Sequence, residues 1–181
     1  MREYLKYLFQ LILSPGHGWE DIDKGSGNPA AVAARGFYPL IAIASLSVWM
    51  QGFYHPHIPF LALFMRMIVT FVVYFISYFF GTFMLSVFVE PMLDDRYDEV
   101  RCQTFTLYSL GLLAVISIIA NCLPVSSALL FFLPMFAALV QWKGHLYMHV
   151  RPDKVGLFMI LAILGVLAPP YIFYFLFSIL F

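Results

Sequence analysis

Charged residues are scarce in this 181-residue chain, where Asp, Glu, Lys and Arg together supply 11% of the sequence. An ordinary globular domain carries about 25%, so this chain has too little charge to cover a water-soluble particle of its size. That shortage excludes a cytosolic enzyme and a disordered tail. The ten basic and ten acidic residues also balance, and no basic tract is present, which argues against nucleic acid as a partner.

Cysteines and enzyme motifs are scarce as well. Cys102 and Cys122 are the two cysteines, and they lie about 30 Å apart if one helix joins them, so they cannot form a disulfide framework. The sequence has no glycine-rich phosphate loop, no Gly-x-Ser-x-Gly elbow, no Cys-x-x-Cys pair and no His-Glu-x-x-His motif. We therefore expect no enzyme activity, and no cofactor apart from the metal ion considered below.

Apolar residues are abundant instead, at 62% of the sequence, and aromatic residues supply 19%. A membrane-spanning helix needs about 20 mainly apolar residues, and unbroken apolar runs without two-residue alternation indicate helices rather than barrel strands. The sequence therefore predicts an all-α polytopic membrane protein with five transmembrane helices. Residues 1–35 form an N-terminal cytoplasmic and interfacial segment, and residues 36–181 form the transmembrane domain. The expected spans are residues 36–54, 58–89, 104–123, 126–149 and 155–181.

The distribution of charged residues predicts the orientation. Nine of the ten Lys and Arg residues lie before the first expected span, or in or next to the connections between the second and third and between the fourth and fifth. All ten acidic residues lie in the same parts of the chain. The positive-inside rule makes these parts cytoplasmic. We therefore expect a cytoplasmic N-terminus, an extracytoplasmic C-terminus and a multi-pass protein of a cell membrane, of the bacterial cytoplasmic type.

The N-terminal segment predicts an amphipathic helix. Arg2, Lys6 and Gln10 recur every four residues and form one polar stripe on an otherwise apolar helix. Such a helix lies in the plane of the headgroups, with Arg2 and Lys6 as interfacial anchors and Trp19 as an aromatic anchor nearby. The alternative is that the helix packs against the transmembrane bundle, and the sequence does not decide between the two.

One charged residue, Arg66, lies inside an apolar run. Arg66 is 24 residues from Glu90, or about 36 Å along a straight helix, which places its guanidinium near the outer headgroups, where snorkelling explains it. A role in transport is the alternative, because an ionisable residue within a membrane often marks a site. A mildly polar face continues from it along the second span. The candidate transport path consists of Arg66, Thr70, Tyr74, Ser77 and Thr82.

The same polar face also has a purely structural explanation. Ser77 and Gly81 form a small-xxx-small pair, which is typical of helices that pack closely. In the fifth span, Pro169 and Pro170 remove backbone donors, so we expect a kink there. Broken helices mark the sites of some transporters, but they also occur in spans that have no site.

Two histidines near the expected cytoplasmic end of the fourth span indicate a candidate metal site. His145 and His149 are four residues apart, so on a continuous helix both imidazoles project from one side. Carboxylates in the expected cytoplasmic loops could complete the coordination of zinc, manganese or iron. The simpler alternative is that both histidines are amphipathic anchors. The candidate metal ligands are His145, His149, Glu90, Asp94 and Asp98.

Three parts of the sequence carry a family resemblance. Leu13-Ser14-Pro15 is followed by Trp19 and a polar approach to the membrane, residues 97–124 lead from a polar loop through a Tyr-Ser entry into the third span, and residues 142–154 precede the last span. Together they resemble the YIP domain (Ypt-interacting protein) family in its compact bacterial form. The resemblance implies the five-span topology and a non-catalytic role in membrane organisation, trafficking or partner binding.

Three functions remain open from the sequence. The first is an integral membrane protein of the YIP type that binds lipid or a cytosolic protein through its N-terminal helix and charged loops. The second is a small transporter or channel that uses the polar face of the second span. The third is a metal-binding membrane protein with a cytoplasmic site of histidines and carboxylates. The lipid bilayer is the expected partner in all three, and the sequence specifies no oligomeric state.

Overall fold

The computed structural model describes residues 1–25, 27–94, 98–123 and 127–180, without the side chains of residues 127–131 and 180. The regular elements in these ranges are all helical, as expected for the all-α class. The expected start of the fourth span, at residue 126, and the expected end of the fifth, at residue 181, lie outside the described residues. The helices are α1 (Arg2–Leu13), α2 (Pro15–Gly25), α3 (Pro29–Val32), α4 (Tyr38–Ser47), α5 (Gln51–Tyr54), α6 (Phe60–Phe88), α7 (Glu99–Cys122), α8 (Ser127–Tyr147), α9 (Val155–Ala162) and α10 (Ala168–Leu180), with short π or 3₁₀ turns at Ala33–Phe37, Val48–Met50, Glu90–Met92, Pro152–Lys154 and Ile163–Leu167.

Four helical segments of the described chain are long and apolar enough to cross a bilayer. At 1.5 Å per residue, each exceeds the roughly 30 Å of hydrocarbon in a typical membrane. α8 occupies the place of the expected fourth span, and the side chains of its first turn lie outside the described part of the chain. The four segments are Pro29–Tyr54, Phe60–Phe88, Glu99–Cys122 and Pro152–Ile179.

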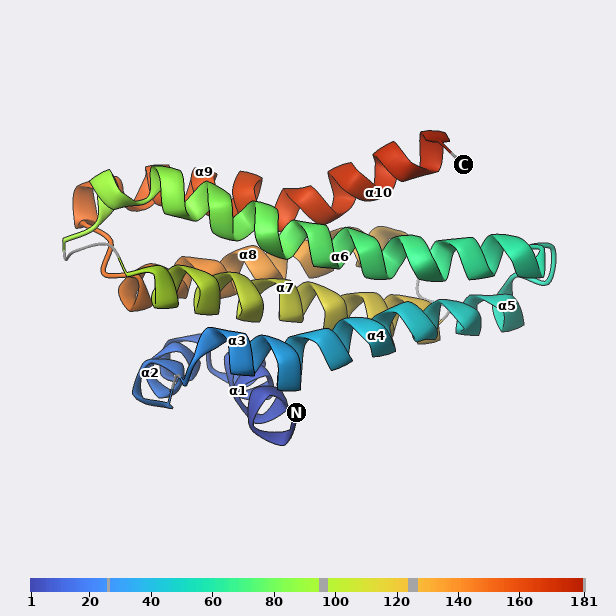
Figure 1. Ribbon diagram of the computed structural model, residues 1–181, viewed down its shortest axis with the longest axis horizontal. Helices are drawn as coiled ribbons and strands as arrows, with labels where there is room; N and C mark the ends of the chain where they lie inside the picture. Colours follow the sequence, from blue (N-terminus) through green and yellow to red (C-terminus); the bar gives the residue numbers. More distant parts are fainter. Residues whose placement is uncertain (26, 95–97, 124–126, 181) are drawn as a thin grey trace.

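The long helices run in alternating directions along one bundle axis (Figure 1). We call one end of the bundle the charged end. It carries the connections that follow α6 and α8, with Glu90 and Arg151, and the first turn of α7, with Arg101. The opposite end, with α5 and the C-terminal end of α7, is the charge-poor end and lies at the right in Figure 1. The helices α4, α6 and α7 pack against one another between the two ends.

Two wide helical turns each precede a proline. The π turn Ala33–Phe37 comes just before Pro39, and the π turn Ile163–Leu167 comes just before Pro169. In both places, the amide after the turn bonds to the carbonyl five residues before it. A proline ring lacks an N–H and clashes with the carbonyl four residues back, so a wider turn relieves the clash. The expected interruption at Pro169 and Pro170 therefore takes the form of a wide turn.

The N-terminal helix α1 packs against the side of the bundle. Its inner face consists of Tyr4, Leu8 and Leu11, each at most 4% exposed. The Tyr4 hydroxyl donates a hydrogen bond to Leu107 O at 2.8 Å, and burial raises the pKa of this phenol well above its usual value. A β-carbon at Gly111 would overlap the Tyr4 hydroxyl, so this glycine of α7 lets α1 approach. The sequence left open whether α1 lies in the headgroups or packs against the bundle. This face of α1 packs against the bundle.

The second helix of the N-terminal hairpin, α2, inserts Trp19 between α7 and α8. The indole is 2% exposed and stacks on Phe105 and on Tyr147, with ring centroids 5.2 Å apart in each pair. Its Nε1 donates a hydrogen bond to Val140 O at 2.9 Å. The prediction that Trp19 is an interfacial anchor is therefore wrong, because α2 folds back and buries the ring in the core instead of leaving it in the headgroups.

Candidate functional site

The structure separates the two histidines of the predicted metal site. α8 ends at Tyr147, and His149 takes a left-handed backbone conformation with a φ of 51°. The prediction that His145 and His149 project from one helical face is therefore wrong. His145 Nδ1 contacts the carbonyl of Trp142 in its own helix, whereas His149 Nδ1 lies 2.9 Å from Arg101 Nη1.

The three candidate carboxylate ligands lie at the charged end and have other local contacts. Glu90 begins the turn after α6, and Asp94 contacts His149 through backbone atoms, its amide donating to the carbonyl at 2.9 Å. Asp98 caps α7 by accepting a hydrogen bond from the amide of Val100. Among the described residues, no three His, Cys, Asp or Glu side chains group closely enough to hold a metal ion.

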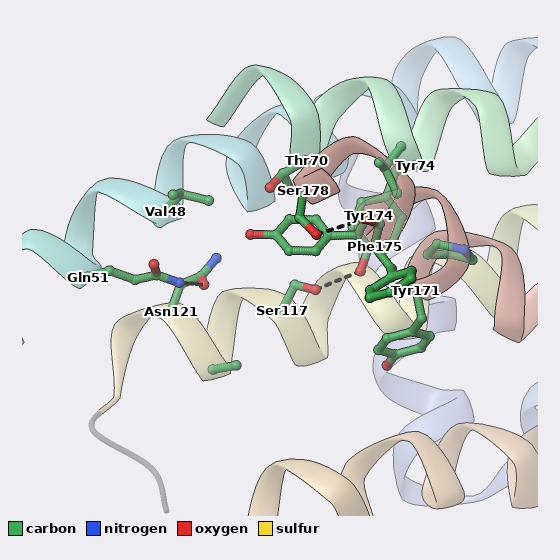
Figure 2. Close-up of a pocket in the computed structure, with 13 residues that line it drawn as sticks. Val48, Gln51, Thr70, Tyr74, Ser117, Asn121, Tyr171, Tyr174, Phe175 and Ser178 are labelled. Carbon is green, nitrogen blue, oxygen red and sulfur yellow. Dashed lines mark hydrogen bonds between the residues drawn. The ribbon is translucent and has the colours of Figure 1, made fainter. Parts of the chain in front are cut away.

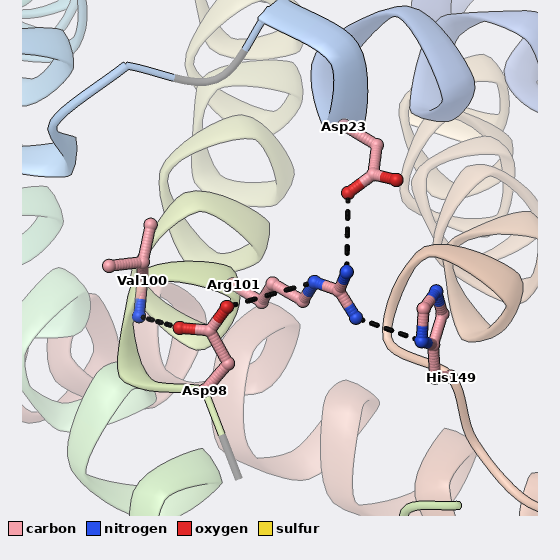
Figure 3. A network of polar contacts seen from close by, with 5 residues as sticks. All are labelled: Asp23, Asp98, Val100, Arg101 and His149. Atoms are coloured by element: carbon pink, nitrogen blue, oxygen red, sulfur yellow. Dashed lines mark hydrogen bonds and ion pairs between the residues drawn. The ribbon is translucent and has the colours of Figure 1, made fainter. Parts of the chain in front are cut away.

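Arg101 connects three segments at the charged end (Figure 3). Its guanidinium lies 3.7 Å from the carboxylate of Asp23 in α2, 3.7 Å from that of Asp98 at the start of α7, and 2.9 Å from His149 Nδ1 after α8. Because a guanidinium only donates, His149 Nδ1 accepts this hydrogen bond, and the proton of the neutral imidazole is on Nε2. We call Asp23, Asp98, Arg101 and His149 the arginine cluster.

Backbone hydrogen bonds hold the same end together. Leu93 and Val150 form an isolated antiparallel bridge, and the Arg151 amide donates to Met92 O at 2.9 Å. The Arg151 side chain also donates to the carbonyl of Pro91. These bonds join the segment after α6 to the segment after α8, so the charged end is one connected surface rather than a set of independent loops.

The face of α1 that points away from the bundle combines basic and apolar side chains. Arg2 and Lys6, the expected basic anchors, are exposed, as are Phe9 at 58% and Leu13 at 84%. At about 100° per residue, these four positions fall within a sector of roughly 60°. This mixture is typical of a helix surface that lies in the headgroup region of a membrane.

Two residues of the candidate transport path line a groove near the charge-poor end (Figure 2). Thr70 and Tyr74 of α6 face α7 and α10 across a groove of about 530 Å³, which lies within the roughly 300–1,000 Å³ of small-molecule sites. The Tyr74 hydroxyl shares a hydrogen bond of 2.6 Å with the hydroxyl of Ser117. Other polar residues that line the groove are Gln51, Asn121, Tyr171, Tyr174 and Ser178.

Two amide side chains form the rim of this groove at the charge-poor end. Gln51 Nε2 donates to Asn121 Oδ1 at 2.7 Å, and Asn121 Nδ2 donates to Ser47 Oγ at 2.9 Å. Arg66 Nη1 reaches Gln51 Oε1 at 3.4 Å, so Arg66 contacts the rim through that amide. The sequence reading missed Gln51 and Asn121. Their amide side chains stand out in otherwise apolar runs, which could have marked them as candidate site residues, but only the fold brings the two amides together.

The remaining residues of the candidate transport path do not continue the groove. Ser77 is fully buried, and Gly81 packs so closely that a β-carbon there would lie 3.2 Å from Gly165 O. Thr82 lines a separate hollow of about 470 Å³ with Glu99 near the charged end. The polar face of α6 is therefore divided into two hollows with close packing between them.

The length and apolarity of these helices define the class of the molecule, which is a multi-pass helical membrane protein. An N-terminal hairpin docked on the bundle distinguishes it within that class. No known protein family, curated protein or solved structure matches the chain.

Proposed function

We propose that this chain is a non-catalytic integral membrane protein of the YIP type, which organises the membrane or binds a cytosolic protein through its charged end. In this proposal the charged end faces the cytoplasm, because the basic residues Arg101, Lys143, Arg151 and Lys154 lie in or beside its connections. The observation that carries the proposal is the position of the α1–α2 hairpin on the side of the bundle, at the level of Gly36 and Gly111.

The apolar surface of the bundle is shorter along the bundle axis beside the hairpin than on the side away from it. From Gly36, which contacts α1, to Tyr54, the first span supplies about 28 Å of helix. On the side away from the hairpin, α6 runs unbroken for 29 residues, or about 43 Å. Near its charged end, Phe83 and Val87 are still 58% and 50% exposed. A bilayer around such a protein has to be thinner beside the hairpin than beside α6, and this mismatch deforms it.

The outward face of α1 supplies the lipid contact that this role needs. Phe9 and Leu13 offer apolar surface, and Arg2 and Lys6 offer positive charge to anionic headgroups. The arginine cluster supports the arrangement, because Arg101 ties α2 to the start of α7 and to the segment after α8.

Reconstitution into liposomes tests this proposal. Phe9→Glu with Leu13→Glu changes two exposed side chains, so the fold is kept while the apolar lipid contact is lost. We expect the wild-type protein to shift the vesicle diameters seen by electron cryomicroscopy, and the double variant to leave them as in protein-free vesicles. Glu20→Gln, at an exposed position of α2, is the control and behaves as wild type.

Unchanged vesicle diameters with the wild-type protein would contradict membrane deformation. Partner binding is then measured separately, with a photo-crosslinking residue in place of Leu13, which is 84% exposed. A crosslinked cytosolic protein that is lost in Arg101→Gln would identify the charged end as a partner-binding surface. No protein crosslink at all would contradict that part of the proposal.

A small transporter or channel is the second candidate, and the groove beside Thr70 and Tyr74 favours it. Close packing at Ser77 and Gly81 separates this groove from the hollow near the charged end, so transport requires that packing to open. Conductance of the reconstituted protein in planar bilayers with potassium chloride tests the channel form. A conductance that disappears in Arg66→Leu supports it, and a conductance that is the same in both proteins removes Arg66 from the path.

A further inference from the structure

The groove near the charge-poor end is lined by both polar and apolar side chains. Gln51 and Asn121 form its polar rim, where their amides bond to each other. Val73 and Ala120 form apolar walls, and Phe175 of α10 lies beside the opening and is 63% exposed. A site with a polar rim and apolar walls matches an amphiphile better than a wholly polar solute.

Arg66 brings a positive charge to this rim. Its guanidinium reaches Gln51 Oε1 at 3.4 Å, a long contact with a neutral group. Within the described ranges, no carboxylate pairs with Arg66. α6 is unbroken from Arg66 to Phe88, which is about 33 Å of helix. In a bilayer, this distance places the guanidinium at the headgroup level of the leaflet at the charge-poor end.

The α10 side of the groove adds a polar group near the rim. Figure 2 shows the ring of Tyr174 lying across the groove, with its hydroxyl turned toward the side on which Gln51 and Asn121 lie. Tyr174 is 42% exposed, so part of this residue is accessible from outside the bundle. Polar groups from α5, α7 and α10 therefore converge on one end of the groove, next to Arg66.

We propose that this groove binds one phospholipid of the leaflet at the charge-poor end. The lipid phosphate contacts the Arg66 guanidinium and the Gln51 amide, which are strong donors to phosphate oxygens. One acyl chain lies in the groove between α6 and α10, against Val73 and Phe175. A free phosphate ion would use only the rim and leave the apolar walls uncovered, so the occupant is a lipid. The site lies opposite the charged end and does not rest on the function proposed for that end.

Native mass spectrometry of the full-length protein, released from nanodiscs that contain phosphatidylglycerol, tests the proposal. We expect one phosphatidylglycerol to remain bound to the wild-type protein. Arg66→Gln removes the charge and lowers the retained lipid about tenfold, which corresponds to about 1.4 kcal/mol. Arg35→Gln is the matched control, because Arg35 is an exposed arginine in the π turn beside α1, away from the groove, and it retains the lipid as wild type.

A second variant separates occupancy of the groove from simple snorkelling of Arg66. Ala120→Leu fills part of the groove from α7 and leaves Arg66 in place, and we expect it to lose the lipid as well. Full retention in Ala120→Leu, together with loss in Arg66→Gln, would show a headgroup contact without the groove and overturn the proposal. Equal retention in Arg66→Gln and wild type would also overturn it. So would displacement of the lipid by inorganic phosphate, because that result indicates a free-anion site.

Discussion

The charged end and the charge-poor end are built from the same kinds of helices, yet in the described chain only the charged end carries an additional docked helix, α2. At the charged end the α1–α2 hairpin covers α7 and α8, with Trp19 stacked between Phe105 and Tyr147. At the charge-poor end no comparable segment of the described chain covers α6, α7 and α10, and a groove of about 530 Å³ remains. The difference shows that a docked segment can bury an aromatic core between two helices, which the spans at the charge-poor end do not do.

The largest effect is expected at the charged end, from Trp19→Ala. The change removes the stacked ring and the hydrogen bond from the indole to Val140 O, so we expect a loss of about 3–5 kcal/mol in the free energy of unfolding. Unfolding in mixed detergent and SDS, followed by circular dichroism, measures it. Trp142→Ala is the control, because Trp142 is 50% exposed and its removal leaves no internal cavity. Equal losses in the two variants would contradict the difference in burial.

The next largest effect is expected from Gly111→Leu, which tests how the hairpin is attached. The new side chain overlaps Tyr4 and Leu8 of α1, so we expect a loss of about 1–3 kcal/mol and faster proteolysis between α1 and α2. Gly156→Ala is the control, because a β-carbon there meets no atom within 4 Å. A hairpin that stays equally protected from protease in Gly111→Leu would argue against this docking.

A smaller effect is expected from Arg101→Gln in the arginine cluster. The side chains of Arg101, Asp23 and Asp98 are 27%, 43% and 47% exposed, and solvent weakens such pairs, so we expect a loss of about 1 kcal/mol. The loss shrinks at high ionic strength because salt screens the charges. Lys154→Gln, which removes an exposed pair with Asp153, serves as the control. A loss in Arg101→Gln that does not change with salt would exclude an electrostatic origin.

The smallest effect is expected at the charge-poor end, from Tyr74→Phe. This change removes the hydrogen bond between the hydroxyls of Tyr74 and Ser117, and such bonds between membrane helices average about 0.6 kcal/mol. A double-mutant cycle with Ser117→Ala, measured by the same unfolding assay, isolates the pair. If the losses in unfolding free energy from Tyr74→Phe and Ser117→Ala add exactly in the double variant, the two hydroxyls do not interact. This hydrogen bond would then not contribute to the stability of the charge-poor end.

The sequence predicted the helical, multi-pass class correctly because long apolar runs have one stable form in a bilayer. It failed at Trp19, because an aromatic residue beside the membrane looks the same whether it anchors in the headgroups or folds back into the core. It also failed at His149, where a four-residue spacing predicted a helical pair and α8 had already ended at Tyr147. Both errors concern how a short segment returns to the bundle, which no local pattern encodes.

By itself, the sequence determined that the chain belongs in a membrane, because 62% apolar and 11% charged residues cannot make a soluble surface. Only the tertiary structure decided which residues meet: Arg101 with Asp23 and His149 at one end, and Gln51 with Asn121 at the other. The physical reason is that hydrophobicity acts on each segment without direction. Hydrogen bonds, ion pairs and ring stacking act only at contact distance, and the partners named here are 48 or more residues apart in the chain.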